Sequence, residues 1–166
     1  MKVHESPPDQ ERLQLIEAVA GDAAELLEIN LTADSSKSIM TKVNEAVVDL
    51  VFERPTPIAE DENPHLLLGS LWGSQMARQF QWYWADVVID DEFKEVAMIS
   101  PNQEMIIFPF GFTAACIDKQ CICTILLAFN MLLENDRIGE IPPGTYENIM
   151  LGIHHIVPPY TLEPNG

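Results

Sequence analysis

The sequence has 166 residues, of which 47% are hydrophobic, and its 26 acidic against nine basic residues give a formal net charge of -17. The length suits one domain with an ordinary core, and the apolar content excludes a disordered chain. So acidic a surface repels phosphate backbones and anionic lipid headgroups, which excludes direct binding to nucleic acid or to a membrane surface.

Two features of the sequence predict a cytoplasmic protein with reduced cysteines. Residues 1–8 lack the apolar segment of a secretory signal, and the longest nearly apolar run, residues 121–133, is too short to span a bilayer. The three cysteines, Cys116, Cys121 and Cys123, are odd in number and lie within one helix-like pattern. We therefore expect reduced, buried thiols and no disulfide.

Two helices are predicted in the first third of the chain. Over residues 8–31 apolar positions recur at spacings of three and four, which indicates one helix face. A second helix with the same periodicity begins at a cap formed by Asp34 or Ser35. It ends before Pro55, because proline removes a backbone donor and biases its predecessor away from the helix.

A third helix begins at Pro64, which follows an Asn63 cap and suits the first turn of a helix. Gly69, Gly73 and Ala77 lie at spacings of four residues and form a stripe of small side chains on this helix. Because glycine within a helix costs about 1 kcal/mol, the stripe predicts that a neighbouring helix or sheet packs closely there.

The hydrophobic period changes to two over residues 81–108, which predicts three β-strands. Short turns join them, so we expect a three-stranded antiparallel meander. Trp82 and Trp84 share one face of the first strand and are expected in the core beneath a helix, whereas Tyr83 lies on the other face.

A fourth helix is predicted after Pro109, capped by Thr113 and extending to about residue 134. It is apolar nearly all round beyond Cys121, so we expect it to be the central buried element.

The predicted fold class is α+β, with helices packed on a three-stranded antiparallel meander sheet in a single domain of residues 1–166. Within it, residues 8–54 form an N-terminal helical pair, and residues 64–134 form a helix, three strands and the central helix. Residues 140–166 add a short helix capped by Thr145, and a tail.

The common enzyme motifs are missing from the sequence, which has no Gly-rich phosphate loop, no Gly-x-Ser-x-Gly elbow and no His-Glu-x-x-His. The cysteines lack the Cys-x2-Cys pairs of zinc sites, and one rigid helix could not wrap all three round an ion, so we expect no metal and no cofactor. The alternative is an orphan enzyme, in which the fold brings together Cys116, His154 or His155 and an acid.

Three short motifs follow one another, one on a helix, one on a strand and one closing a hairpin: Leu68-Gly69-x-x-x-Gly73, Trp82-x-Trp84 and Phe108-Pro109. Over about residues 64–130 this order resembles an uncharacterised family of small bacterial α+β domains of unknown function. The resemblance implies a bacterial protein and brings no catalytic residues with it.

Acidic residues gather at two places in the N-terminal part of the chain. They are Asp22, Glu25 and Glu28 on the first helix, and Glu60, Asp61 and Glu62 in the loop before the third. Like charges on successive helical turns repel, and a domain under no other demand would intersperse Lys or Arg there. We therefore predict a non-enzymatic protein of the immunity or inhibitor type, whose acidic face binds a basic protein partner with Tyr83 as an aromatic anchor. A homodimer is compatible with the same features.

Overall fold

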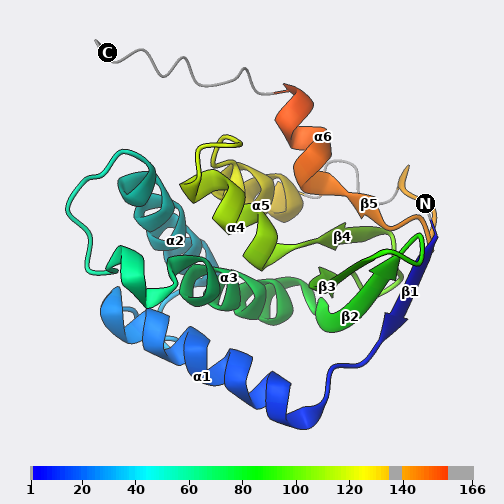
Figure 1. Ribbon diagram of the computed structural model, residues 1–166, viewed down its shortest axis with the longest axis horizontal. Helices are drawn as coiled ribbons and strands as arrows, with labels where there is room; N and C mark the ends of the chain where they lie inside the picture. The colour runs from blue at the N-terminus through cyan, green and yellow to red at the C-terminus, as the bar shows by residue number, and fades with distance from the viewer. Residues whose placement is uncertain (1, 135–139, 157–166) are drawn as a thin grey trace.

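The computed structural model describes residues 2–134 and 140–156, and of residues 60 and 154–156 it describes the backbone alone. The elements in chain order are β1 (Val3–Ser6), α1 (Gln10–Leu26), α2 (Ser36–Val51), the 3-10 turn η1 (Glu60–Glu62), α3 (Pro64–Phe80), β2 (Tyr83–Ile89), β3 (Phe93–Ile99), β4 (Met105–Ile107), α4 (Pro109–Ile117), α5 (Ile125–Glu134), β5 (Glu147–Asn148) and α6 (Ile149–Ile156). The strands gather at one end of the long axis, and most of the helices fill the rest (Figure 1). This arrangement confirms the α+β class.

The sheet has five strands in the order β1-β2-β3-β4-β5. The predicted meander is present in β2, β3 and β4, which pair antiparallel. The expectation of three strands was wrong, because β1 pairs antiparallel with β2 and β5 pairs parallel with β4. These two edge strands span four and two residues, too few for a period of two to stand out in the sequence.

Local signals mark the beginnings of α2 and α3 correctly. The hydroxyl of Ser35 accepts a hydrogen bond from the backbone N–H of Ser38 at 3.1 Å and caps α2. Pro64 occupies the first turn of α3, although Asn63 before it makes no side-chain cap. The helix α3 packs against α1, α2 and α4, and is therefore the central helix of the fold.

The single fourth helix predicted for residues 113–134 was wrong, because the segment forms two helices, α4 and α5. Pro109 begins α4, and Thr113 lies buried inside this helix and does not cap it. The polar residues 118–120 interrupt the apolar run and are exposed between the two helices. The last helix also differs, because Thr145 precedes β5 and α6 begins at Ile149.

In the described part of the chain, α1 to α4 each end near a non-glycine residue with left-handed backbone. These residues are Glu28, Glu53, Gln81 and Lys119, with φ values of 55°, 55°, 61° and 63°. After α4 the N–H of Lys119 donates to the carbonyl of Cys116 (3.0 Å) and the N–H of Gln120 to that of Ala115 (2.8 Å), which is a Schellman motif. Glycine is the usual residue here, so these four helix ends lack the usual glycine signal. This is why the first helix was predicted to residue 31, whereas α1 ends at Leu26.

Two hydrophobic cores lie on opposite faces of the sheet. The larger joins the helices to one face and includes Trp72, Trp82 and Phe129, with Trp84 packed against it. The smaller covers the other face and contains Ala85, Val87, Ala97, Ile99 and Ile106, with Tyr83 and Tyr146 packed against it. The predicted placement of Trp82 and Trp84 in the helix-facing core, with Tyr83 opposite, is confirmed.

The sheet curls around the smaller core until its two edges meet. Glu5 of β1 accepts hydrogen bonds from the hydroxyls of Tyr83 in β2 and Tyr146, the residue before β5, each at 2.8 Å. The side-chain amide of Gln103 donates to the Tyr83 hydroxyl at 3.2 Å. One carboxylate therefore ties the first strand to the last.

Candidate functional site

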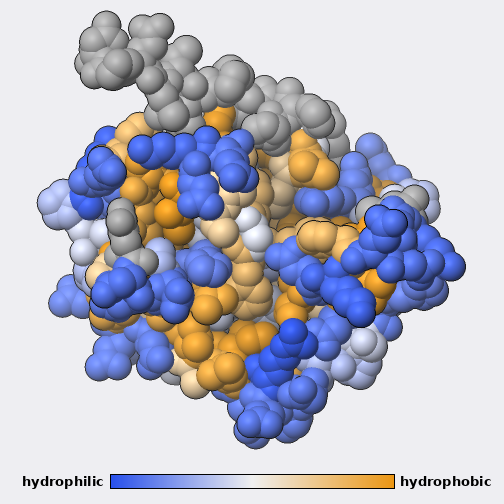
Figure 2. Space-filling model, in the orientation of Figure 1, coloured by the Kyte–Doolittle hydropathy of each residue, from blue (hydrophilic) through white to orange (hydrophobic). Residues whose placement is uncertain are grey.

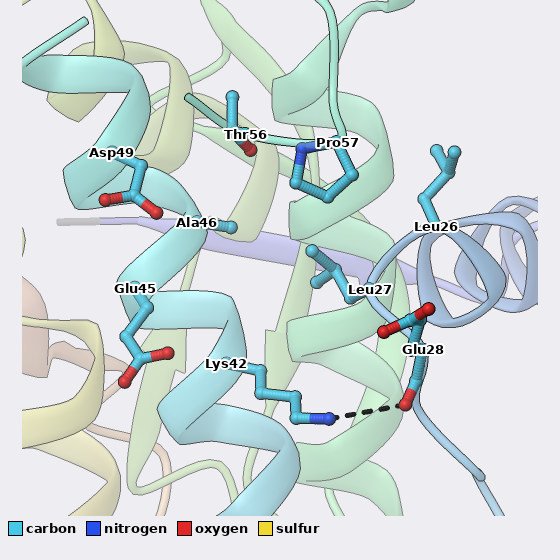
Figure 3. A pocket seen from close by; sticks show the side chains of 9 residues that line it. All are labelled: Leu26, Leu27, Glu28, Lys42, Glu45, Ala46, Asp49, Thr56 and Pro57. Atoms are coloured by element: carbon cyan, nitrogen blue, oxygen red, sulfur yellow. Dashed lines mark hydrogen bonds between the residues drawn. The ribbon is translucent and has the colours of Figure 1, made fainter. Parts of the chain in front are cut away.

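A groove of about 490 Å³ lies between the C-terminal end of α1, the middle of α2 and the loop that follows α2 (Figure 3). Its apolar lining consists of Leu26, Leu27, Ala46 and Pro57, and its polar lining of Glu28, Lys42, Glu45, Asp49 and Thr56. The groove thus combines an apolar surface with three carboxylates and one ammonium group.

The negative charge of this groove is only partly compensated. The Lys42 Nζ donates to the backbone carbonyl of Glu28 at 3.3 Å, as Figure 3 shows, and Asp49 lies 3.9 Å from the guanidinium of Arg54. Among the described residues, no hydrogen bond or ion pair reaches the carboxylate of Glu28 or of Glu45. A cationic group that entered the groove would meet two unpaired carboxylates.

Local structure explains how these acids come to share one groove. The left-handed backbone of Glu28 ends α1 and turns the chain, which leaves Glu28 beside α2. Glu45 and Asp49 are four residues apart on α2 and therefore lie on the same side of that helix.

Of the five predicted acids whose side chains are described, only Glu28 lines the groove. Asp22 and Glu25 are exposed on α1, but Glu28 lies beyond the end of that helix, so the expectation of three charges on successive helical turns was wrong. The loop that carries the other three leads from Thr56 and Pro57 at the groove into η1. Asp61 and Glu62 are exposed there, and the side chain of Glu60 lies outside the described residues.

The structure does not bring Tyr83 to these acids. Tyr83 begins β2, which Figure 1 shows among the strands and apart from α2, and its half-buried hydroxyl is hydrogen-bonded to Glu5. Burial raises the pKa of Tyr83, and the neighbouring Glu5 raises it further. Tyr83 does not line the groove.

The sequence reasoning missed Glu45, Asp49 and Lys42. A weak signal was present, because Lys42, Glu45 and Asp49 follow the spacing of one polar face of the second helix. That this face borders the end of α1 follows only from the packing of the two helices.

The three cysteines come together, contrary to the argument that they lie on one rigid helix. Cys116 is buried in α4, and the Sγ of Cys121 in the following loop is 3.7 Å from the Sγ of Cys116. The Sγ of Cys123 donates to Oδ1 of Asn44 in α2 at 3.2 Å. None of the three is part of a disulfide, and within residues 2–134 and 140–156 no three Cys, His, Asp or Glu side chains are arranged to hold a metal ion.

The alternative of a Cys and His enzyme site depends on two histidines whose side chains are not described. His154 and His155 belong to α6, but their side chains lie outside the described residues. The described hydrogen-bond partners of Cys116 are the other two cysteines and the carbonyl of Ile122.

Comparison of the chain with protein-family models, with curated proteins and with solved structures finds no match in any of the three. The resemblance over residues 64–130 therefore stays a prediction. Within the described ranges, every helix is too short or too polar to cross a membrane.

Proposed function

We propose that this protein binds a basic protein partner, as an immunity or inhibitor protein does, and that the groove between α1 and α2 receives a lysine or arginine side chain of that partner. The observation that carries the proposal is the pair of unpaired carboxylates, Glu28 and Glu45, beside an apolar surface. A lysine or arginine has the matching structure, an apolar stem and a cationic head.

The stem of such a side chain would lie against Leu26, Leu27 and Pro57, and its head would lie between the carboxylates. Exposed acids nearby, Asp22 and Glu25 on α1, would attract the partner before contact. Attraction of this kind raises the association rate and weakens as salt is added.

The surface also offers apolar area to a protein partner. Figure 2 shows hydrophobic residues exposed between hydrophilic ones on the face that it draws. Leu15 on α1 is 62% exposed. A partner protein could therefore bury apolar surface as well as pair charges.

The test compares two double charge reversals with the same change in net charge. Glu28→Lys with Glu45→Lys alters the groove, and Glu92→Lys with Glu147→Lys alters exposed positions at the sheet end. The probe is a short peptide in which arginine alternates with glycine, and its binding is measured by fluorescence anisotropy at low salt. Two lost charge contacts of about 0.7 kcal/mol each predict binding roughly tenfold weaker for the groove variant.

The affinity of the control variant for the peptide should fall by less than about threefold, because its charges act only at long range. An equal loss in both variants would show that net charge alone attracts cations. Failure of the unaltered protein to bind the peptide at low salt would reject the groove as a site for basic side chains.

A further inference from the structure

The loop after α4 gathers thiols around Cys116. The Schellman turn at Lys119 reverses the chain, so that Cys121 returns to α4 with its sulfur 3.7 Å from that of Cys116. Cys123 follows, and its thiol is hydrogen-bonded to Cys116 as well as to Asn44. Cys116 is buried, whereas the two loop cysteines are half-buried.

The three thiols differ in acidity. The hydrogen bond from Cys116 lowers the pKa of Cys123, burial opposes part of this effect, and the backbone N–H of Ile125 lowers the pKa further. The pKa of Cys116 is raised, first by this hydrogen bond and then by burial, and burial raises the pKa of Cys121. Because the thiolate is the reactive form in thiol oxidation, the lowered pKa favours Cys123 as the thiol that reacts first.

We propose that this cluster is an oxidation site for hydroperoxides, at which Cys116 and Cys121 end joined in a disulfide. This inference is independent of the acidic groove. It rests on three thiols held close together, one buried in α4 and two half-buried in the loop that follows.

The reaction balances in three steps. The Cys123 thiolate attacks a peroxide oxygen, so that an S–O bond forms, the O–O bond breaks, and the departing oxygen takes a proton from water to leave as an alcohol, or as water when the oxidant is hydrogen peroxide. Cys116 then loses its proton and attacks the sulfenic sulfur, which forms a disulfide and releases water. Cys121 next loses its proton, attacks Cys116 and displaces Cys123 as a thiolate. In sum, two thiols and one hydroperoxide give one disulfide, one alcohol and one water, and the sulfurs lose the two electrons that the peroxide gains.

The last step favours the pair Cys116 and Cys121. Among the three sulfurs Cys123 is the best leaving group, because a thiol of low pKa leaves fastest. Once released and protonated, Cys123 regains its hydrogen bond to Asn44, which also accepts the N–H of Leu126 at 3.1 Å.

Trypsin separates the proposed partners. It cuts after Lys119, so Cys116 falls on the peptide of residues 95–119, and the other two thiols fall on residues 120–137. Folded protein is treated with an equal amount of hydrogen peroxide, alkylated, digested without reductant and analysed by mass spectrometry. The expected product is the two peptides linked through Cys121, with Cys123 alkylated.

Single serine variants test each step. Cys121→Ser should stop at a link between Cys116 and Cys123, and Cys116→Ser should give no linked peptides. Cys123→Ser should form the disulfide between Cys116 and Cys121 at least about tenfold more slowly, because it lacks the most reactive thiolate. Circular dichroism shows whether each variant keeps its fold, and the result for the unaltered protein does not depend on them.

The same treatment in denaturant is the control, and there the preference for Cys121 over Cys123 should disappear. Three results would overturn the proposal in the folded protein: two unlinked peptides after peroxide, a bond between Cys121 and Cys123 within one peptide, or a disulfide between two chains. An undiminished rate in Cys123→Ser would also contradict it.

Discussion

The indole ring of Trp84 occupies the space beside Gly73 in which a side chain at residue 73 would have to lie. Trp84 also stacks on Phe110, with ring centroids 5.4 Å apart and an interplanar angle of 12°. Phe110 in turn lies against Gly69. The two glycines therefore allow β2 and α4 to reach the backbone of α3, as the stripe of small residues predicts.

Substitution of Gly73 by alanine should destabilise the fold. The added methyl group overlaps the Trp84 ring, and such overpacking lowers the free energy of unfolding by about 1–3 kcal/mol. The helix propensity of alanine offsets about 1 kcal/mol of that cost. Denaturation in urea measures the difference.

Gly21→Ala is the matched control, because Gly21 lies within α1 and a methyl group there would meet open space. It should raise the free energy of unfolding by about 0.5–1 kcal/mol. If Gly73→Ala proved as stabilising as Gly21→Ala, the close approach of Trp84 to α3 would be wrong.

The left-handed residue after α2 gives a second prediction. Glu53 is exposed and has a φ of 55°, a conformation that costs a side-chain-bearing residue roughly 1–2 kcal/mol. Glu53→Gly should raise the free energy of unfolding by about 0.5–1 kcal/mol, since the greater freedom of glycine in the unfolded chain cancels part of the gain. Glu53→Ala keeps the unfavourable conformation and should give no gain. Equal urea midpoints for the two variants would contradict this account of the helix end.

Thr113 gives a third prediction, because its hydroxyl is buried in α4 and has no hydrogen-bond partner among the described residues. Valine has the same shape without the hydroxyl, so Thr113→Val should raise the free energy of unfolding by about 1 kcal/mol. Thr113→Ser keeps the hydroxyl and loses the methyl group, and should lower it by a similar amount, about 1 kcal/mol. Thermal unfolding of both variants checks the order of their stabilities. A Thr113→Val variant less stable than Thr113→Ser would show that the Thr113 hydroxyl makes a hydrogen bond.

Sequence reasoning succeeded where the determining signal is local. Ser35 and Pro64 begin α2 and α3 as their residue types indicate, and the change of period to two places β2 and β3. It failed at Lys119, where the break between α4 and α5 depends on a left-handed residue that no residue type announces. It also missed β1, because a four-residue strand is stabilised by its partner and not by its own pattern.

The candidate site was predicted even less completely than the fold. Glu28 drew attention through its acidic neighbours, but Glu45 joins it only because α2 lies beside the end of α1. The contact between Cys116 and Cys121 was not predicted for the same reason, since the distance between their sulfurs is set by the turn that separates them. Both sites depend on how elements meet, and single-sequence periodicity does not contain that information.

The Glu5 carboxylate, placed between Tyr83 and Tyr146, should make stability fall in alkali. Burial, with smaller contributions from the hydrogen bond and charge of Glu5, raises the pKa of Tyr146 to about 12. A tyrosine in the unfolded chain titrates near pH ~10, so the folded state holds this proton more tightly. The resulting stability is complete below pH ~10 and is lost as the pH rises to about 12, because the unfolded chain releases its proton first.

Replacement of Tyr146 by phenylalanine tests this relationship. The variant loses the hydrogen bond to Glu5, so its free energy of unfolding near neutral pH should fall by about 1 kcal/mol. It should also show a shallower decline above pH ~10, because one of the two tyrosines with a raised pKa is gone. Glu5→Gln is the companion variant, since it keeps an acceptor and removes the charge, and phenolate absorbance should then rise at lower pH in the folded protein. A decline of unchanged steepness in Tyr146→Phe would mean that other groups cause the loss of stability in alkali, and that the bond between β1 and the start of β5 contributes little to closing the sheet.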